Sequence, residues 1–147
     1  MSTQTDSLAV GLFSEILTVD QLARNNVAKV LPRGMELSHF SVLNHLARSQ
    51  TEKSPAQLAR TFHLTRGAMT NTLRKLEAAG YIHIRPDWDD ARRKMVTISP
   101  AGRKARDAAV AAIAPIIAEA VDEVGPEKVR AILPVLRALR VNLSADE

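Results

Sequence analysis

A cluster of opposite charges occupies the stretch RPDWDDARRKMVTIS, residues 85–99. It contains three acids, Asp87, Asp89 and Asp90, and directly after them three bases, Arg92, Arg93 and Lys94. A carboxylate two residues before an arginine can hold its guanidinium by a charge-assisted hydrogen bond. An arginine held on a loop in this way is suited to the electronegative minor groove of a duplex. We therefore predict that Asp90 orients Arg92 and that Arg92 is the inserted residue.

The neighbouring charges have two interpretations. Arg93 and Lys94 would face phosphates, although one of them can instead lie on the solvent face of the strand that follows. Asp87 and Asp89 can simply belong to a polar loop whose opposite charges offset each other. We keep this polar-loop interpretation for Asp87 and Asp89.

A helix-turn-helix is predicted upstream of this loop. In SPAQLARTF, Ser54 is an N-cap, Pro55 occupies the first helical position and Gln57 completes a capping box. This short helix should end near Phe62. After the tight turn HLT, Thr65 caps a second helix, RGAMTNTLRKLEAA, which Gly80 ends.

The second of these helices has two distinct faces. Met69, Leu73 and Leu76 form an apolar stripe at helical spacing. The opposite face is small and polar near the N-terminus and carries Arg66, Gly67, Thr70, Asn71 and Arg74. A helix that enters the major groove needs such a face to offer donors to base edges, although many solvated helices look similar.

The charged loop lies between two alternating runs, YIHIR and KMVTIS. Ile82 and Ile84 share one face of the first run, and Val96 and Ile98 share one face of the second. Two such runs around a polar loop predict a β-hairpin. Helix, turn, helix, hairpin is the order of a winged helix, and the charged loop is its wing.

Helices are also predicted on both sides of this segment. One runs from Ser7 to Leu31, with Leu8, Leu12, Ile16 and Leu22 in one stripe, Phe13 and Leu17 beside it, and PRG as its stop. Ser38 is expected to cap a second helix that ends near Arg48 and turns Phe40, Leu43 and Ala47 inward.

After the hairpin, Ser99 caps and Pro100 begins a long helix, which Pro115 should kink near Ala111. Gly125 and Pro126 break the chain. The last helix should reach about Asn142, with Val129, Leu133, Leu136 and Leu139 as an apolar stripe and an unexpected Pro134 inside it.

The charge distribution also favours a polyanionic partner. From Thr51 to Arg106 there are 12 Lys and Arg against 5 Asp and Glu, a net charge of +7, whereas the rest of the chain has 8 against 11, a net charge of −3. A basic segment in an otherwise acidic chain suggests nucleic acid, and an unevenly charged solvated surface is the alternative.

Composition excludes several other classes of protein. There is no cysteine, which removes disulfides, thiolate metal sites and thiol redox sensing. The start has no basic segment before its apolar residues, so a signal peptide is not expected. The longest apolar run, Ala108 to Ala118, is 11 residues and too short to span a bilayer. We expect a soluble, cytoplasmic protein.

The segment from Glu36 to Arg103 resembles the MarR (multiple antibiotic resistance regulator) family of winged-helix transcription factors. The resemblance rests on LSHFSVLNHLA, SPAQLARTFHLTRGAMTNTLRKLEAAGYI, the wing DWDDARR, and VTISPAG at the start of the next helix. The residues that match the family's wing pattern are Asp87, Asp90, Arg92 and Gly102. Trp88 replaces the usual proline, and Ile98-Ser99 replaces Leu-Thr.

The resemblance implies a mainly α fold with a small β-hairpin, in a single domain over residues 1–147. Its winged helix-turn-helix would span residues 36–99, and helices at 7–34 and 100–143 would form a homodimer that reads a palindromic operator. An intramolecular helical layer is the alternative to the dimer. The resemblance also implies a small organic effector, often phenolic, between the DNA-binding lobe and the dimer helices. No residue identifies this effector.

We predict a sequence-specific DNA-binding transcriptional regulator, a repressor of homodimeric form. The predicted DNA-binding residues are Thr65, Arg66, Gly67, Thr70, Asn71, Arg74, Lys75, Asp90, Arg92, Arg93 and Lys94. The rival hypothesis is a winged helix used for protein–protein contacts without effector control, which an acidic or apolar recognition face would favour.

Neither catalysis nor a resident cofactor is expected. The sequence has no phosphate-cradling glycine loop and no nucleophile motif, so we predict that the protein is not an enzyme. The histidines, His39, His45, His63 and His83, have no i, i+4 pairing. Glu36 with His39 and His45 is the only local hint of a metal site, and we expect none.

Overall fold

The computed structural model describes residues 3–49 and 51–144. Within them the elements are α1 (Thr3–Val30), α2 (Leu37–Arg48), α3 (Pro55–Thr61), α4 (Arg66–Ala78), β1 (Ile82–Pro86), β2 (Lys94–Ile98), α5 (Pro100–Val124) and α6 (Pro126–Ser144). The chain divides into two compact units, Met1–Ala112 and Ile113–Glu147, so that α5 begins in the first and ends in the second. The predicted fold class, mainly α with one small hairpin, is confirmed.

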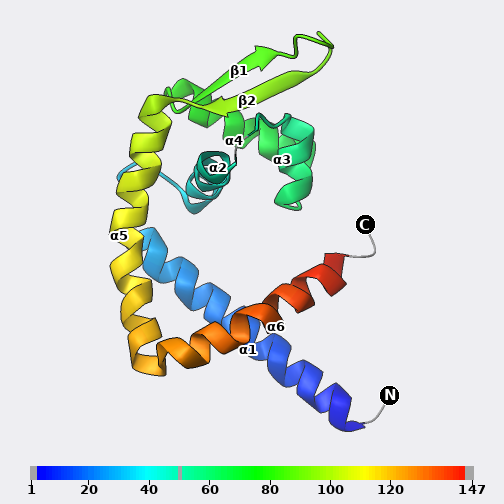
Figure 1. Ribbon diagram of the computed structural model, residues 1–147, viewed down its shortest axis with the longest axis vertical. Coiled ribbons are helices and arrows are strands. Elements are labelled where there is room, and N and C mark those ends of the chain that lie inside the picture. Colours follow the sequence, from blue (N-terminus) through cyan, green and yellow to red (C-terminus); the bar gives the residue numbers. More distant parts are fainter. Residues whose placement is uncertain (1–2, 50, 145–147) are drawn as a thin grey trace. The chain divides into compact units, whose positions relative to one another are not determined.

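The core of the first unit lies between the short helices and the hairpin. Leu43 of α2, Leu58 of α3, Met69 and Leu76 of α4, and Val96 of β2 are all fully or almost fully buried. Figure 1 shows α2, α3 and α4 grouped on one side of the hairpin, whose loop projects beyond them. Burial of these side chains supplies the apolar driving force that fixes the helix-turn-helix against the wing.

The predicted hairpin is present, and each run places its isoleucine and valine residues on one face as predicted. Ile82 pairs with Ile98 and Ile84 with Val96 in an antiparallel two-stranded sheet, so the four apolar residues share one face. Lys53 adds a bridge on Val96, with backbone N–O distances of 3.3 and 2.7 Å. The segment before α3 is thereby tied to the wing.

A close backbone contact fixes the start of α5. The Ser99 hydroxyl accepts from the Gly102 amide at 2.9 Å, as a cap does, and donates to the Gly80 carbonyl at 2.6 Å. The Ser99 amide donates to the Tyr81 carbonyl at 2.9 Å. A Cβ at Gly102 would lie 2.0 Å from that carbonyl oxygen, so only glycine fits at this position. The Ser-Pro-x-Gly sequence therefore joins α5 to the turn after α4.

Two boundary predictions were wrong. The first helix begins at Thr3, one turn before Ser7, because Thr3 to Asp6 contains no helix breaker. The N-cap of α2 is Glu36 rather than Ser38. His39 occupies the third helical position, and its Nδ1 accepts from the Glu36 amide at 3.1 Å, so an imidazole takes the part usually played by Glu or Gln.

The buried face of α2 also differs from the prediction. Leu43 is fully buried as expected, but Phe40 and Ala47 are only partly covered. The other residues that α2 buries are His39, Val42 and Leu46. The inward stripe is therefore turned by about one residue from the predicted one, because Val42, Leu43 and Leu46 are the residues of α2 that pack into the core cluster.

The second unit consists of the end of α5 and α6. Gly125 has φ +115° and separates the two helices, as predicted, and α6 begins at Pro126. Both helices continue through their internal prolines, Pro115 and Pro134. None of the described residues of α6 is buried.

The long helices expose many apolar side chains within one chain. In α1 they include Leu8, Leu12, Phe13, Ile16, Leu17 and Leu22, with Val27 as its only buried residue. In α6 they include Ile132, Leu133, Val135 and Leu136. None of the helices in the described part of the chain has the length and hydropathy needed to cross a bilayer. The single-domain boundaries and the dimerisation role of these helices stay predictions.

Candidate nucleic-acid interface

The helix α4 presents its polar face because its other face is buried. Met69, Leu73 and Leu76 are at most 2% exposed. The Thr65 hydroxyl accepts from the Ala68 amide at 3.1 Å and caps the helix as predicted. The residues on the opposite face, Arg66, Gly67, Thr70, Asn71 and Arg74, are all exposed. The polar side chains of this face are therefore open to solvent and can meet a ligand.

The turn before α4 is fixed by the short helix α3. The Ser54–Gln57 capping box is present, with hydrogen bonds of 2.8 and 3.2 Å between each side chain and the other residue's amide. Leu58 and Ala59 anchor α3 in the core. His63 adopts φ +53°, which allows the chain to reverse within three residues. The predicted helix-turn-helix is thus confirmed in its caps and its turn.

The wing contains the predicted pair of opposite charges. Arg92 donates from Nε to Asp90 Oδ1 at 3.1 Å and from its own backbone amide to the same oxygen at 3.0 Å. The Arg92 side chain is nevertheless 91% exposed. The side-chain hydrogen bond is the larger cause and the backbone hydrogen bond the next, and together they hold the pKa of Asp90 below its ordinary value. Asp90 therefore stays ionised and orients the guanidinium group of an arginine that remains almost fully exposed.

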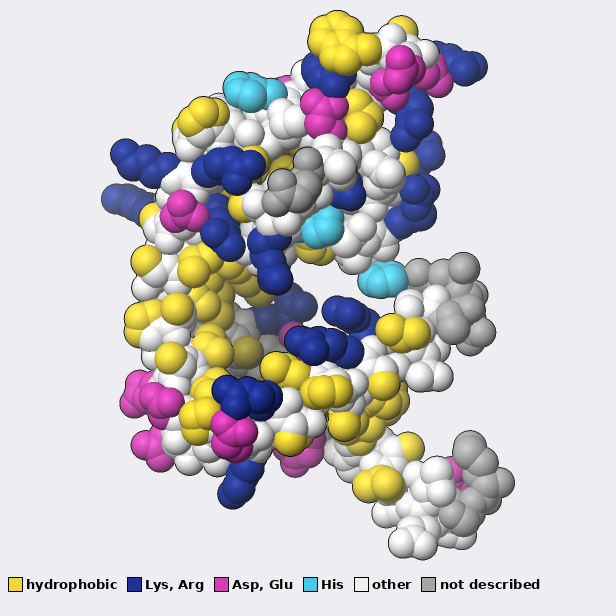
Figure 2. Space-filling model, viewed as in Figure 1, with side chains coloured by type: hydrophobic (Ala, Val, Ile, Leu, Met, Phe, Trp, Pro, Cys, Tyr) yellow, Lys and Arg dark blue, Asp and Glu magenta, His cyan; other side chains and the backbone are white. Residues whose placement is uncertain are grey.

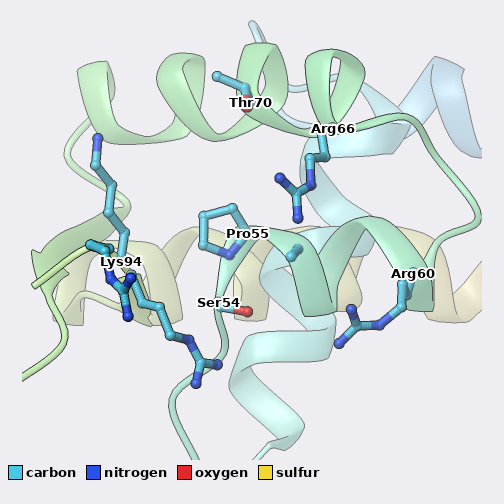
Figure 3. Close-up of a pocket in the computed structure, with 9 residues that line it drawn as sticks. Ser54, Pro55, Arg60, Arg66, Thr70 and Lys94 are labelled. Atoms are coloured by element: carbon cyan, nitrogen blue, oxygen red, sulfur yellow. The ribbon is translucent and has the colours of Figure 1, made fainter. Parts of the chain in front are cut away.

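A cation-lined cleft lies between the wing and the helices α3 and α4. Its volume is about 490 Å³, and the residues that line it are Ser54, Pro55, Ala56, Arg60, Arg66, Thr70, Arg92, Arg93 and Lys94. Five of these nine are Lys or Arg and none is acidic. In Figure 3, Arg66 on α4 and Lys94 on the wing reach into the space between α4 and α3 from different sides. We call this feature the cation cleft.

The cation cleft lies along one edge of the lobe. Figure 2 shows Lys and Arg side chains gathered along the right-hand edge of its upper part. Arg60, on α3, belongs to the cleft but was missed by sequence reasoning, which looked for contacts only on the second helix and the wing. Its signal was an exposed cation at the end of the first helix of a helix-turn-helix.

The remaining predicted residues are placed in three ways. Arg74 lines a smaller pocket of about 180 Å³ with Thr70 and Lys94, next to the cation cleft. Thr65, Gly67 and Asn71 are exposed at the start of α4 but do not line the cleft. Lys75 lines a different cavity, so the structure does not bring it together with the rest.

The cavity beside Lys75 has a mixed lining. Its volume is about 550 Å³, and it is enclosed by Pro32 to Glu36, His39, the end of α4, Tyr81 and the first half of α5. Arg33 and Lys75 supply positive charge, while Met35, Leu76 and Tyr81 supply apolar or aromatic surface. We call it the mixed cavity. Sequence reasoning did not identify it, because its residues come from three separated segments, 32–39, 75–81 and 105–108.

Metal-ligating residues are dispersed in the described part of the chain. No three His, Asp or Glu side chains there come together as a metal-binding group. His45 packs edge-on against Phe62, with ring centroids 5.5 Å apart. Burial, and then the nearby Lys53, lower the pKa of His45, which favours its neutral form.

Known proteins with this arrangement are winged-helix regulators. Residues 33–93 match the family model described as MarR family. BldR, a transcriptional regulator from Sulfolobus solfataricus, has 22% identity and a TM-score of 0.77, with 94% of this chain and 99% of that chain covered. A single-residue mutant of E. coli MarR in complex with operator DNA has 18% identity and a TM-score of 0.77, with 95% of this chain and 99% of that chain covered.

A third similar structure carries a small molecule. CouR from Rhodococcus jostii RHA1, bound to p-coumaroyl-CoA, has 19% identity and a TM-score of 0.73, with 88% of each chain covered. No curated protein matches the sequence itself. Residues 33–93 are therefore similar to the MarR family, and the chain has the fold of these solved regulator structures.

Proposed function

We propose that this protein is a transcriptional regulator that binds duplex DNA through the cation cleft and the exposed face of α4. The observation that carries the proposal is the cleft's five cations without a carboxylate among its lining residues. Phosphate contacts supply most of the affinity of such proteins, and clustered Lys and Arg are their signature. The rival protein-contact module would be favoured by an acidic or apolar face, which the cleft lacks.

The two parts of this surface suit the two grooves of DNA. The start of α4, with Arg66, Thr70 and Asn71, is narrow and polar enough to enter the major groove and offer donors to base edges. Arg92 on the wing suits the adjacent minor groove, and Arg93 and Lys94 suit its phosphates. This division gives sequence preference to α4 and positioning to the wing.

A homodimer follows from the apolar surface that one chain leaves open. The exposed leucines, isoleucines and valines of α1 and α6 form stripes that water would otherwise contact. A second copy of the chain can cover these stripes and would place two recognition helices on a palindromic operator. Occupation of a promoter by such a dimer would block transcription, so we propose a cytoplasmic repressor rather than an enzyme.

The mixed cavity is the proposed effector site. Its apolar residues suit an aromatic ring, and Arg33 and Lys75 suit a carboxylate or phenolate on it. Lys75 and Leu76 belong to α4, so a ligand there would contact the recognition helix directly. Such a ligand can shift α4 only by its differential affinity for the free and DNA-bound positions of that helix.

The experiment that tests the function begins with selection of bound sequences from random duplexes. Enrichment of a palindrome, with log Kd rising steeply with log salt, is the expected result. If every cleft cation of both protomers met a phosphate, the slope would reach about 9. Binding without any sequence enrichment, or no binding at low salt, would refute the proposal. The selected operator then allows a screen of small aromatic acids for loss of binding.

A further inference from the structure

Arg85 on β1 is the centre of a group of contacts that the DNA-binding surface described above does not use. Its Nε donates to Glu52 Oε1 at 3.2 Å, and its Nη2 donates to the other Glu52 oxygen. Its Nη1 donates to the Pro86 carbonyl at 2.7 Å. The guanidinium carbon lies 4.8 Å from the ring centre of Trp88, in a cation–π contact. One side chain thus joins Glu52, in the segment before α3, to the end of β1 and to Trp88 in the wing.

These contacts lie on the outer face of the hairpin. Ile84 and Val96 pair on the face that meets the core, so Arg85 and its partner Met95 lie on the opposite face. Glu52 directly precedes Lys53, which bridges to Val96. The Glu52–Arg85 ion pair, in which both side chains are about two-thirds covered, therefore joins the segment before α3 to the wing.

Trp88 lies at the tip of the wing and is 80% exposed. The loop that carries it is closed by hydrogen bonds of 2.9 Å from the Asp87 amide to the Arg93 carbonyl and from the Arg93 amide to the Asp90 carbonyl. An indole that is held in place and still open to water leaves a large apolar surface uncovered. Such an aromatic side chain is typical of an interface whose partner is absent.

We propose that Trp88 is a further DNA-contacting residue, whose indole packs on the deoxyribose edge of the minor groove beside Arg92, and that Glu52 and Arg85 position it. The inference rests on the proposed DNA binding. Asp87 and Asp89 are the sequence neighbours of Trp88 and repel phosphates, so the uncharged sugar edge is the part of the duplex that suits the indole. Trp88 and Arg92 share one closed loop, so a wing in the groove brings both to the DNA.

Trp88 is the only tryptophan of the chain, so its fluorescence reports on this residue alone when tyrosine is not excited. The full-length protein is titrated with an unlabelled selected duplex, while anisotropy of a labelled copy measures binding in parallel. We expect the emission to shift to shorter wavelength and acrylamide quenching to fall as the duplex saturates. Binding by anisotropy with unchanged emission and quenching would overturn the inference and leave the proposed function intact. Absence of binding would overturn both.

Variants separate the indole from the charges. Trp88→Ala should weaken binding by about tenfold, as loss of an interface aromatic does, with an unchanged salt slope because the indole neutralises no phosphate. Arg92→Ala should instead lower that slope. Trp88→Phe, which keeps a ring over Arg85, should lose less than Trp88→Ala. Equal affinity of Trp88→Ala and the wild type would contradict a DNA contact.

The positioning role is tested by coupling. Glu52→Gln should weaken binding in the wild type but have no effect once Trp88 is alanine. Arg85→Lys should restore part of the binding that Arg85→Met loses. Asp20→Asn, which breaks the exposed Asp20–Arg24 pair on α1, is the matched control and should not couple to Trp88. An equal loss from Glu52→Gln with and without the indole would show that Glu52 does not act through Trp88.

Discussion

Replacement of Gly102 by alanine is expected to destabilise the first unit strongly. The new Cβ would lie 2.0 Å from the Tyr81 carbonyl oxygen and 2.9 Å from both Tyr81 C and Ile98 Cγ1. A real Cβ does not come this close to backbone, so the start of α5 must move away by about 1 Å or more. That movement would break the hydrogen bonds of Ser99 to Tyr81 and Gly80.

The size of the effect follows from three contributions. Overpacking costs about 1–3 kcal/mol, and the two hydrogen bonds contribute about 1 kcal/mol each. Alanine has a higher helix propensity than glycine, and this difference stabilises the helix by about 1 kcal/mol. The net loss for Gly102→Ala is therefore about 2–4 kcal/mol in the free energy of unfolding.

Urea unfolding followed by circular dichroism, at one fixed protein concentration, measures this loss. Gly67→Ala is the matched control, because a Cβ there meets nothing within 4 Å, and it should stabilise by up to about 1 kcal/mol. If Gly102→Ala unfolds at the same urea concentration as the wild type with the same slope, the proposed packing of α5 on the turn after α4 is wrong.

Three other predictions concern the wing, pH and assembly. Arg92→Ala should weaken DNA binding about tenfold and lower the salt slope by about one per protomer. Asp90→Ala should cost less DNA affinity, and in a protein that already lacks Arg92 it should be neutral or slightly favourable. An equal effect of Asp90→Ala with and without Arg92 would exclude the pairing. Because burial and Lys53 lower the pKa of His45, the midpoint of urea unfolding should be constant well above pH 6.5 and should fall as the pH drops from 6.5 towards the lowered pKa. His45→Gln should remove this contribution to the fall, and a pH profile that the substitution leaves unchanged would contradict the prediction. Light scattering should give twice 16.1 kDa for the wild type, and Leu133→Glu should shift it towards one chain; a monomeric wild type would count against the dimer.

The local features were predictable because their signals are local. The caps at Ser54, Thr65 and Ser99 use side chains within three residues, and the apolar face of the hairpin follows from alternating apolar residues. The Asp90–Arg92 pair was found by the same reasoning, because two residues of separation suffice for the contact. The cap of α2 was missed, since a histidine at the third position is not the usual capping partner.

The features that depend on tertiary contacts were not predictable. Arg60 joins the cation cleft only because α3 packs under the wing. Arg85 contacts Glu52 across 33 positions of sequence, and no local pattern predicts that contact. Lys75 follows Arg74 directly, but the helix turn places it in the mixed cavity instead of beside the cleft.

The central claim is that the surface made by α4 and the wing binds duplex DNA. Its most direct test compares two double variants of equal charge by anisotropy with a selected duplex. Arg66→Ala with Arg93→Ala removes two cations of the cleft, and Lys29→Ala with Lys104→Ala removes two exposed cations that do not line it. We predict a loss of about 30-fold and a salt slope lower by about two per protomer for the cleft pair. The control pair should change little, and equal losses for the two pairs would contradict the claim.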